Sequence, residues 1–289
     1  MLTVIVSGLA MGSIYALIAL GFTLIWNAVG VVNFAQGELV MLGAFVSVAW
    51  FINGLHLAWP LVLVATIVVM ALFGVAIAVG LYHPLRNAPQ LATIVSTLGL
   101  SIFLKNAAVL IWGPQPLATP GPFGNSTIRL ASSTLYTQQI LIIVFLIVLM
   151  VVQVVVLSRT QFGRAMRATA QDREVSRLMG VRTGIVIMVI FAYASVLAGI
   201  AGLLLAPLFY VSAGMGGVLA LKAFAASIIG GFGSEVGAVV GGLLLGGVEG
   251  VGSFYMSPSY IDVLSFGLLI VFLVVRPQGI FGEPVMDRP

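Results

Sequence analysis

The stretch GSIYALIALGFTLIWNAVGVVNFAQGELVMLGAF, residues 12–45, contains a single charged side chain, that of Glu38. A run this apolar cannot form the water-facing surface of a soluble domain. Asn33 and Gln36 precede Glu38, and glycines interrupt the helical pattern around them. Non-helical backbone is tolerated at membrane depth where it is buried in protein or lines water. The stretch therefore predicts either a broken helix beside a polar cavity or a kink capped by its own amides.

The composition of the whole chain points the same way. Of its 289 residues, 61% are hydrophobic and 7% are charged, and the mean hydropathy is +1.21. A soluble domain has about 25% charged residues and needs them on its surface. Apolar runs of about 20 residues, the length that crosses a bilayer, recur from end to end. We therefore expect an all-α polytopic membrane protein in which residues 1–289 form one transmembrane domain without a soluble domain.

The apolar runs predict about eight or nine transmembrane helices, including a possible re-entrant or broken segment. Turn-forming Gly, Pro, Asn and Ser residues separate them. The predicted spans are roughly 2–26, 28–52, 59–82, 91–112, 137–158, 184–210, 236–256 and 259–276, with a doubtful segment at about 214–232.

The positions of Lys and Arg predict the orientation, because cytoplasmic loops retain positive charge. The loop 159–183, Arg86 and the tail with Arg288 are assigned to the cytoplasm, and the segment 113–136 to the outside. Counting spans back from Arg86 places the N-terminus outside and leaves the C-terminus cytoplasmic. An odd number of crossings is then required, so either 214–232 crosses the membrane or one C-terminal segment is re-entrant.

Glycines recur every four residues beyond residue 230. Small residues at this spacing form a flat helix face on which another backbone packs closely. We expect helix packing from these residues rather than a direct role in substrate passage. They are Gly233, Gly237, Gly241, Gly242, Gly246 and Gly250.

Several charged and amide side chains fall within the predicted spans. A charge at bilayer depth costs at least about 2.5 kcal/mol, so such residues usually pair or face a wet cavity. Lys105 and Asp262 lie nearer span ends and could reach the interface instead. The residues expected to line a pathway or to be buried polar groups are Asn33, Gln36, Glu38, Lys222 and Glu249.

The most polar segment is SRTQFGRAMRATAQDREVSRLMGVRTG, residues 158–184. Thr169 and Asp172 have the spacing of a capping box, and Gly180 suits the left-handed residue that ends a helix. A surface helix of about ten residues is predicted. Such a short helix is marginal in water, so we expect a partner to dock against it. A solvated loop on the positively charged side of the membrane is the alternative.

Other function classes lack their residues in this sequence. The chain has no cysteine, and its two histidines, His56 and His83, lie in different loops. Neither a metal cluster nor a histidine triad is expected. No G-x-x-x-x-G-K-[ST] loop for nucleotide phosphates is present. The net charge of +4 is confined to one loop, which gives no support to nucleic-acid binding. We predict no catalytic residues, no metal site and no cofactor in this chain.

The stretch 12–45 together with GRAMRATAQDREVSRLMGV, residues 163–181, resembles the permease subunits of ABC importers for branched-chain amino acids, the LivH type. The resemblance continues through GVLALKAFAASIIGGFGSEVGAVVGGLLLGGVEG, residues 217–250, and RPQGIFG, residues 276–282. It spans nearly the whole chain. It implies a multi-pass permease of the bacterial cytoplasmic (inner) membrane.

The resemblance also implies partners. These are two ABC ATPase subunits that use ATP and Mg²⁺, a second related permease, an extracytoplasmic substrate-binding protein and the lipid bilayer. In that family the cytoplasmic loop contacts the ATPase through an "EAA" region, in whose place Ala168-Thr169-Ala170 stands here. Carried over by position, the coupling residues are Gly163, Arg164, Arg167, Ala168, Ala170, Asp172 and Gly180.

The function expected from this resemblance is ATP-driven import of branched-chain amino acids or related small amino acid, amide or carboxylate solutes. This chain would line half of the translocation pathway. An ion-coupled secondary transporter is the alternative, because broken helices and intramembrane carboxylates suit that class equally well. Glu38 or Glu249 would then carry the proton. An intramembrane enzyme would need a nucleophile beside a base, and neither is visible in the sequence.

Overall fold

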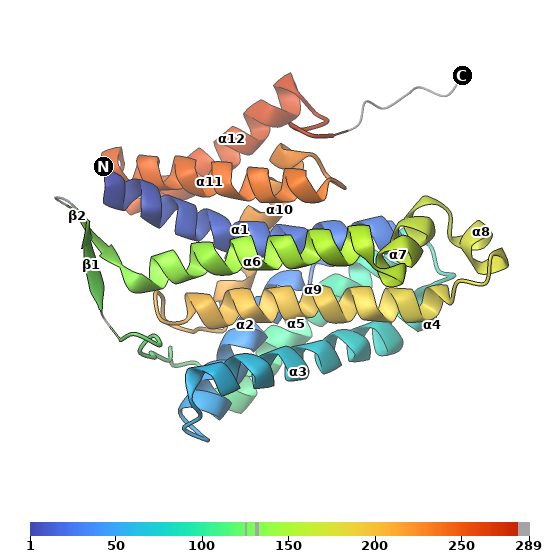
Figure 1. The fold of residues 1–289 in the computed structure, drawn as a ribbon, viewed down its shortest axis with the longest axis horizontal. Coiled ribbons are helices and arrows are strands. Elements are labelled where there is room, and N and C mark those ends of the chain that lie inside the picture. Colours follow the sequence, from blue (N-terminus) through green and yellow to red (C-terminus); the bar gives the residue numbers. More distant parts are fainter. Residues whose placement is uncertain (125, 131–132, 283–289) are drawn as a thin grey trace.

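A computed structural model describes residues 1–124, 126–130 and 133–282, and most of them are helical (Figure 1). Arg288 of the predicted cytoplasmic tail lies outside the described residues. The elements are α1 Leu2–Val29, α2 Gln36–Phe45, the π-helix η1 Val46–Ile52, α3 Trp59–Ile77, the π-helix η2 Ala78–Tyr82, α4 His83–Leu85, α5 Gln90–Trp112, β1 Thr127–Leu130, β2 Ser133–Tyr136, α6 Thr137–Arg159, α7 Gln161–Gln171, α8 Arg173–Leu178, α9 Thr183–Leu205, α10 Met215–Gly230, α11 Glu235–Tyr255, the 3₁₀ helix η3 Pro258–Tyr260 and α12 Ile261–Val275.

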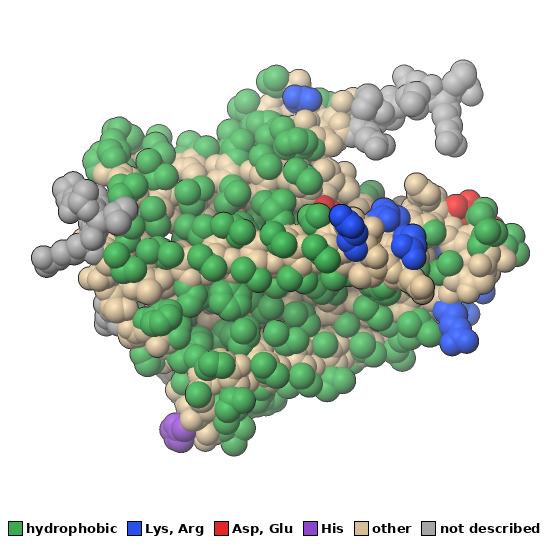
Figure 2. All heavy atoms as spheres, viewed as in Figure 1, with side chains coloured by type: hydrophobic (Ala, Val, Ile, Leu, Met, Phe, Trp, Pro, Cys, Tyr) green, Lys and Arg blue, Asp and Glu red, His purple; other side chains and the backbone are tan. Residues whose placement is uncertain are grey.

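The described residues contain seven helices that are long and apolar enough to cross a membrane. Two shorter apolar helices, Gln36–Ile52 and Met215–Gly230, add to them. The expectation of an all-α polytopic membrane protein is confirmed. Many Leu, Ile and Val side chains of α5, α6 and α12 are exposed on the outside of the bundle, as helices facing lipid require. Figure 2 shows this apolar surface along the length of the molecule.

The predicted span 28–52 begins later than expected, at Gln36, and continues to Ile52. Helix α1 continues to Val29 and ends at Gly30, whose φ of +70° is left-handed and suits glycine. Residues 30–35 are not helical, and the next helix begins only at Gln36. The Asn33 side chain accepts a hydrogen bond from the amide of Ala35 at 3.1 Å, so it stabilises the turn that leads into α2. The helix is therefore broken here, and the Asn33 amide caps the break as the second of the two expectations described.

The short helix that follows lies at the centre of the molecule. Every residue from Gln36 to Val48 is buried. Helices α5, α9 and α10 pack against α2. Gly37 approaches the backbone of α10 so closely that a methyl group there would lie 2.2 Å from the carbonyl oxygen of Gly216. The buried carboxylate of Glu38 and the buried amide of Gln36 thus lie in a segment that other helices enclose completely.

Helices α1 and α11 meet along a face of small residues. A methyl group at Gly246 would lie 2.2 Å from Gly12 Cα, and one at Gly250 would lie 2.7 Å from Gly8 Cα. Gly242 meets Ala16, and Gly237 and Gly241 meet α10, in the same way. The expectation for Gly233 is wrong: its φ is +99°, and it lies in the turn before α11 rather than on the helix face. Two backbones therefore approach within van der Waals distance along most of this stripe.

The two ends of the bundle differ in character. The N-terminus lies beside the β1–β2 hairpin, and α7, α8 and α4 lie at the opposite end (Figure 1). The chain after α12 returns to that second end, where the amides of Ile280 and Phe281 donate to the carbonyls of Ile229 and Gly230 at 2.9 and 2.8 Å. Lys and Arg side chains gather there (Figure 2). Met1 and the last described residues are thus at opposite ends of the bundle.

Candidate functional site: the interhelical loop and the polar interior

The loop between α6 and α9 forms two short helices rather than the one that was predicted. The Thr160 hydroxyl caps α7 by accepting from the amide of Gly163 at 3.0 Å. The Asp172 carboxylate caps α8 by accepting from the amides of Glu174 and Val175, both at 2.9 Å. The predicted capping box is wrong, because Thr169 lies inside α7 and its hydroxyl donates to the carbonyl of Ala165. Asp172 is itself the N-cap, so the chain breaks and restarts at that residue.

Two glycines shape this loop. Gly163 is buried where α7 folds back on α6, and a methyl group on it would lie 2.2 Å from the carbonyl oxygen of Leu157. Arg167 donates a hydrogen bond to that same carbonyl. Gly180 has a φ of +84° and follows α8, as the sequence predicted for the end of a helix. Gly163 therefore sets the angle between α6 and α7, and its surface is not available to a partner.

Helix α8 is held to the bundle by Arg173. The guanidinium donates to the hydroxyl of Tyr82 at 2.7 Å and to the carbonyl oxygen of Ala28 at 2.8 Å. Beyond this anchor, Leu178 and Met179 are 86% and 80% exposed at the tip of the loop. Large apolar side chains so exposed at a polar end of the molecule indicate a contact surface. Of the other predicted coupling residues, Arg164, Arg167, Ala170, Asp172 and Gly180 are exposed and Ala168 is half-buried.

Residues 30–38, which comprise the link between α1 and α2 and the first turn of α2, are joined to α5 by a row of polar contacts. The Gln90 amide donates to the carbonyl of Gly30 at 2.8 Å, and the amide of Phe34 donates to the Thr97 hydroxyl at 3.3 Å. The Ser101 hydroxyl donates to Glu38 Oε1 at 3.2 Å. We call this row the polar seam. These hydrogen bonds give partners to backbone groups of residues 30–35 that lie outside any helix.

The α5 side of the polar seam was missed in the sequence. Thr93, Thr97 and Ser101 follow one another at four-residue spacing, which places them on one face of a helix. This four-residue spacing of hydroxyl side chains in an apolar segment could have indicated a polar helix face. Lys105 extends the same row, and it is exposed.

Several buried polar atoms of the segment have no hydrogen-bond partner among the described residues. They include Asn33 Nδ2, Gln36 Oε1 and Glu38 Oε2. Glu38 is 4% exposed, and the Gln36 amide nitrogen donates to the carbonyl of Ala194 at 3.0 Å. Buried polar groups normally bind protein, water or a ligand. Asn33, Gln36 and Glu38 thus each leave one buried polar atom without a partner in the described part of the protein.

A second polar cluster surrounds Lys222. Its ammonium lies 2.8 Å from Glu249 Oε1 and 2.9 Å from Asp262 Oδ1. The Tyr15 hydroxyl donates to Glu249 Oε2 at 2.7 Å, and the Ser265 hydroxyl donates to Oε1 of the same carboxylate. We call Lys222, Glu249 and Asp262 the charge triad. Residues of α1, α10, α11 and α12 thereby meet at one point. Asp262, which the sequence suggested could reach the membrane interface, is paired with Lys222.

The predicted polar residues therefore form two groups rather than one. Asn33, Gln36 and Glu38 belong to the segment beside α5, whereas Lys222 and Glu249 belong to the charge triad. Helix α10 separates them: its Gly216 end contacts Glu38, and Lys222 lies further along it. In the part of the chain that the structure describes, no group of three or more potential metal ligands occurs.

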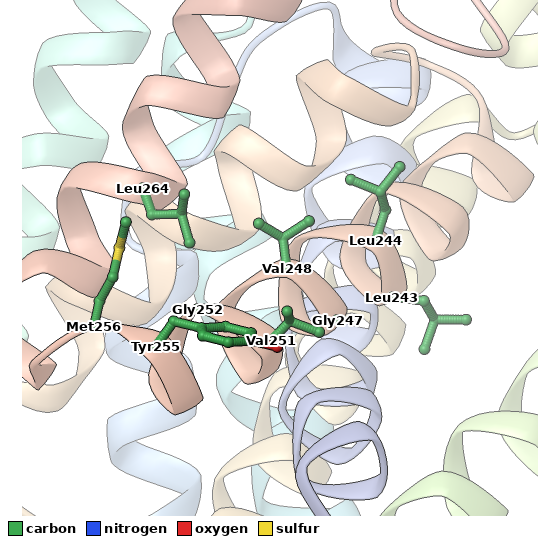
Figure 3. Close-up of a pocket in the computed structure, with 9 residues that line it drawn as sticks. All are labelled: Leu243, Leu244, Gly247, Val248, Val251, Gly252, Tyr255, Met256 and Leu264. Atoms are coloured by element: carbon green, nitrogen blue, oxygen red, sulfur yellow. The ribbon is translucent and has the colours of Figure 1, made fainter. Parts of the chain in front are cut away.

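An apolar groove of about 480 Å³ lies between α11 and α12 (Figure 3). Leu243, Leu244, Val248, Val251 and Leu264 line it together with glycines, Tyr255 and Met256. Its lining contains no charged side chain, so it is unsuited to a zwitterionic solute. The polar interior of the bundle lies elsewhere, at the polar seam and the charge triad.

Comparison with known proteins decides the family. A family profile described as "Branched-chain amino acid transport system / permease component" matches residues 4–273. The chain belongs to this permease family. No solved structure matches it.

Named permeases of this family are similar to the chain over almost its entire length. The high-affinity branched-chain amino acid transport system permease protein LivH of Escherichia coli strain K12 is 36% identical, over 98% of this chain and 96% of the relative. The permease protein BraD of Pseudomonas aeruginosa is also 36% identical with the same coverage. LivH of Salmonella typhimurium is 35% identical. The predicted resemblance is thus confirmed, and the chain is a multi-pass membrane permease.

Proposed function

We propose that this permease is a subunit of an ATP-driven ABC importer of the inner membrane for branched-chain amino acids or related small amino acid, amide or carboxylate solutes. The observation that carries the proposal is the family match over residues 4–273, with relatives whose names specify branched-chain amino acid transport. The polytopic fold and the absence of a nucleotide-phosphate loop in the sequence support a division of labour between subunits. The proposed partners are two ABC ATPase subunits that bind ATP and Mg²⁺, a second related permease and an extracytoplasmic substrate-binding protein.

We also propose nine crossings, with the N-terminus outside and the C-terminus cytoplasmic. The seven long helices and the two short ones at Gln36–Ile52 and Met215–Gly230 would supply them. An odd number agrees with the positions of Met1 and the last described residues at opposite ends of the bundle. The arginines of α7 and α8 support a cytoplasmic location for that end.

Helices α7 and α8 are the proposed contact for the ATPase. Two independently capped helices stand beyond the membrane-crossing bundle and end in an exposed apolar tip. Arg173 links α8 to the end of α1 and to Tyr82. Movement of the ATPase subunits would be transmitted through this link to the transmembrane helices. Of the coupling residues inferred from the sequence, Gly163 acts by setting the loop's shape, because it is buried against α6.

The polar seam is the proposed border of the translocation pathway. Its unpartnered buried atoms at Asn33, Gln36 and Glu38 support contact with water or a polar solute. The charge triad has a different proposed role. Its Lys222 and Glu249 side chains satisfy each other and hold α12, so we assign them to structure rather than to solute contact.

The test of this function uses the chain co-expressed with its genomic neighbours and purified in mild detergent. ATP hydrolysis and uptake of radiolabelled leucine are measured in proteoliposomes. We expect a P-loop ATPase and a second permease to co-purify, and we expect uptake to require ATP. Uptake by the chain alone, driven by a proton gradient without ATP, would overturn the proposal in favour of the secondary transporter.

The contact with the ATPase is tested separately at the exposed tip of the loop. Leu178→Asp with Met179→Asp should leave the permease folded and abolish co-purification of the ATPase. The matched control is Leu55→Asp, which also changes an exposed leucine, 64% exposed, in a loop distant from α8. Retention of the ATPase by the double variant would contradict this contact.

A further inference from the structure

A crevice of about 820 Å³ opens at the arginine-rich end of the bundle, between α4, α8 and the first turns of α9. Arg86, Arg173, Arg177 and Arg182 line it, with Glu174 as the only acidic side chain in its lining. We call it the arginine crevice. Four guanidinium groups around one carboxylate create a strongly positive pocket, which favours an anionic ligand.

The arginines of the crevice differ in how far they are already engaged. Arg173 is hydrogen-bonded to Tyr82 and Ala28, and Arg86 contacts Nε2 of His83 at 2.7 Å. Within the described residues, no salt bridge involves Arg86, Arg177 or Arg182. Arg177 and Arg182 also make no side-chain hydrogen bond to another described residue, and Glu174 lies in no ion pair. Their donors remain available to a ligand from outside the chain.

One part of the crevice lining is apolar and comes from segments long and apolar enough to cross a membrane. Val79 is 52% exposed and Ile185 is 47% exposed, and both belong to membrane-crossing segments. Ile187 and Met188 continue this lining on α9. The crevice therefore combines basic side chains with exposed apolar side chains of membrane-crossing segments. A soluble phosphate compound would use only the first of these features, whereas a phospholipid would use both.

We propose that the arginine crevice binds an anionic phospholipid. The phosphate would contact Arg86, Arg177 and Arg182, and an acyl chain would lie against Val79 and Ile185. Basic pockets between transmembrane helices on the cytoplasmic side recognise anionic headgroups in this way. The lipid would bridge α4 and α8, so it would steady the helix that we assign to the ATPase contact. The binding site itself does not depend on that assignment.

The test measures lipid retention by native mass spectrometry on the full-length chain in detergent. The probes are dioleoyl phosphatidylglycerol and dioleoyl phosphatidylcholine, which have identical acyl chains. We expect one phosphatidylglycerol to be retained in clear preference to phosphatidylcholine. Arg86→Gln with Arg182→Gln should weaken retention of phosphatidylglycerol about 25-fold, since each basic residue near a membrane surface contributes roughly fivefold.

The matched control is Arg159→Gln with Arg276→Gln, which removes the same charge from exposed residues outside the crevice. It should retain phosphatidylglycerol like the unmodified chain. Equal losses in the two double variants, or equal retention of the two lipids, would overturn the proposal. Displacement of the lipid by millimolar inorganic phosphate would show a free-anion site instead and would also overturn it.

A second variant keeps every arginine and fills the space. A methyl group on Gly184, in the lining of the crevice, would have no atom within 4 Å. Gly184→Phe should therefore fold normally and exclude the lipid. Unchanged retention of phosphatidylglycerol by this variant would contradict binding inside the crevice even if the arginine variant failed to fold.

Discussion

The guanidinium of Arg173 donates to the carbonyl oxygen of Ala28 at 2.8 Å, which ties α8 to the end of α1 across 145 residues of sequence. The last carbonyls of a helix have no partner within that helix. Arg173 supplies one to α1, and its positive charge also suits the negative end of the helix dipole. The contact thus stabilises α1 and fixes the position of α8 at the same time.

Replacement of Arg173 by Gln should release α8. A hydrogen bond to a charged group contributes about 1.5–3 kcal/mol, so amide hydrogen exchange in residues 173–180 should accelerate at least about tenfold. Stimulated ATP hydrolysis should fall while the yield of folded permease stays unchanged. Arg159→Gln is the control, because Arg159 is an exposed arginine of α6 with no such anchor. Unaltered exchange in α8 would rule out this anchoring role.

The charge triad should be sensitive to loss of its cation. Lys222→Met leaves Glu249 buried without a counter-ion, and breaking a buried pair from one side costs about 3–5 kcal/mol. The thermal midpoint in detergent should fall steeply. Lys222→Met combined with Glu249→Gln should recover part of that loss, because it removes both buried charges. Lys105→Met, which changes an exposed lysine outside any ion pair with the described residues, should have little effect.

The role of the polar seam in stability is tested at Thr97, and the neighbouring Ser96 provides the control. Thr97→Val removes the acceptor of the Phe34 amide and should destabilise the permease by about 1–3 kcal/mol, the cost of an unsatisfied buried donor. Uptake should fall with it, because segment 30–38 would lose its position. Ser96→Ala should be nearly neutral, since the Ser96 hydroxyl only donates to a carbonyl of its own helix. Comparable melting curves for the two variants would contradict a structural role of the seam.

The glycine stripe is tested by two adjacent positions of α11. Gly246→Val places a side chain against the backbone of Gly12, and backbone atoms cannot move aside as a flexible side chain can. Little folded protein should therefore elute in size-exclusion chromatography. Gly247→Val should elute normally, because a methyl group there has no atom within 4 Å. Similar behaviour of the two variants would mean that α1 and α11 are not in close backbone contact.

Sequence reasoning succeeded where local periodicity determines structure. The apolar runs located the long helices, and the spacing of Gly242, Gly246 and Gly250 matches the stripe that contacts α1. It failed where the outcome depends on a distant partner. Gly233 shares the spacing but lies in a turn, and Thr169 shares the capping pattern but lies inside α7.

The candidate site likewise contains features that the local sequence predicts and features that depend on distant partners. Intramembrane charge predicted that Lys222 would be paired, but the sequence could not identify Glu249 and Asp262 as its partners, because they are brought together only by the packing of three helices. Asn33 and Glu38 looked like neighbours of Lys222 by their chemistry alone. In the structure helix α10 lies between them and Lys222, and hydroxyls of α5, which carry no charge that would have drawn attention to them, bind Glu38 and the backbone amide of Phe34.

The complete burial of residues 36–48 also bears on biosynthesis. This segment leaves the ribosome directly after α1, yet α9 and α10, which pack against it, are synthesised more than a hundred residues later. With the amide of Gln36 and the carboxylate of Glu38 near its start, it is a poor substrate for release into lipid on its own. We expect it to remain beside the insertion machinery until α9 arrives. Chains truncated before Thr183 should therefore be degraded rapidly in pulse-chase experiments, whereas chains extended through Tyr255 should persist.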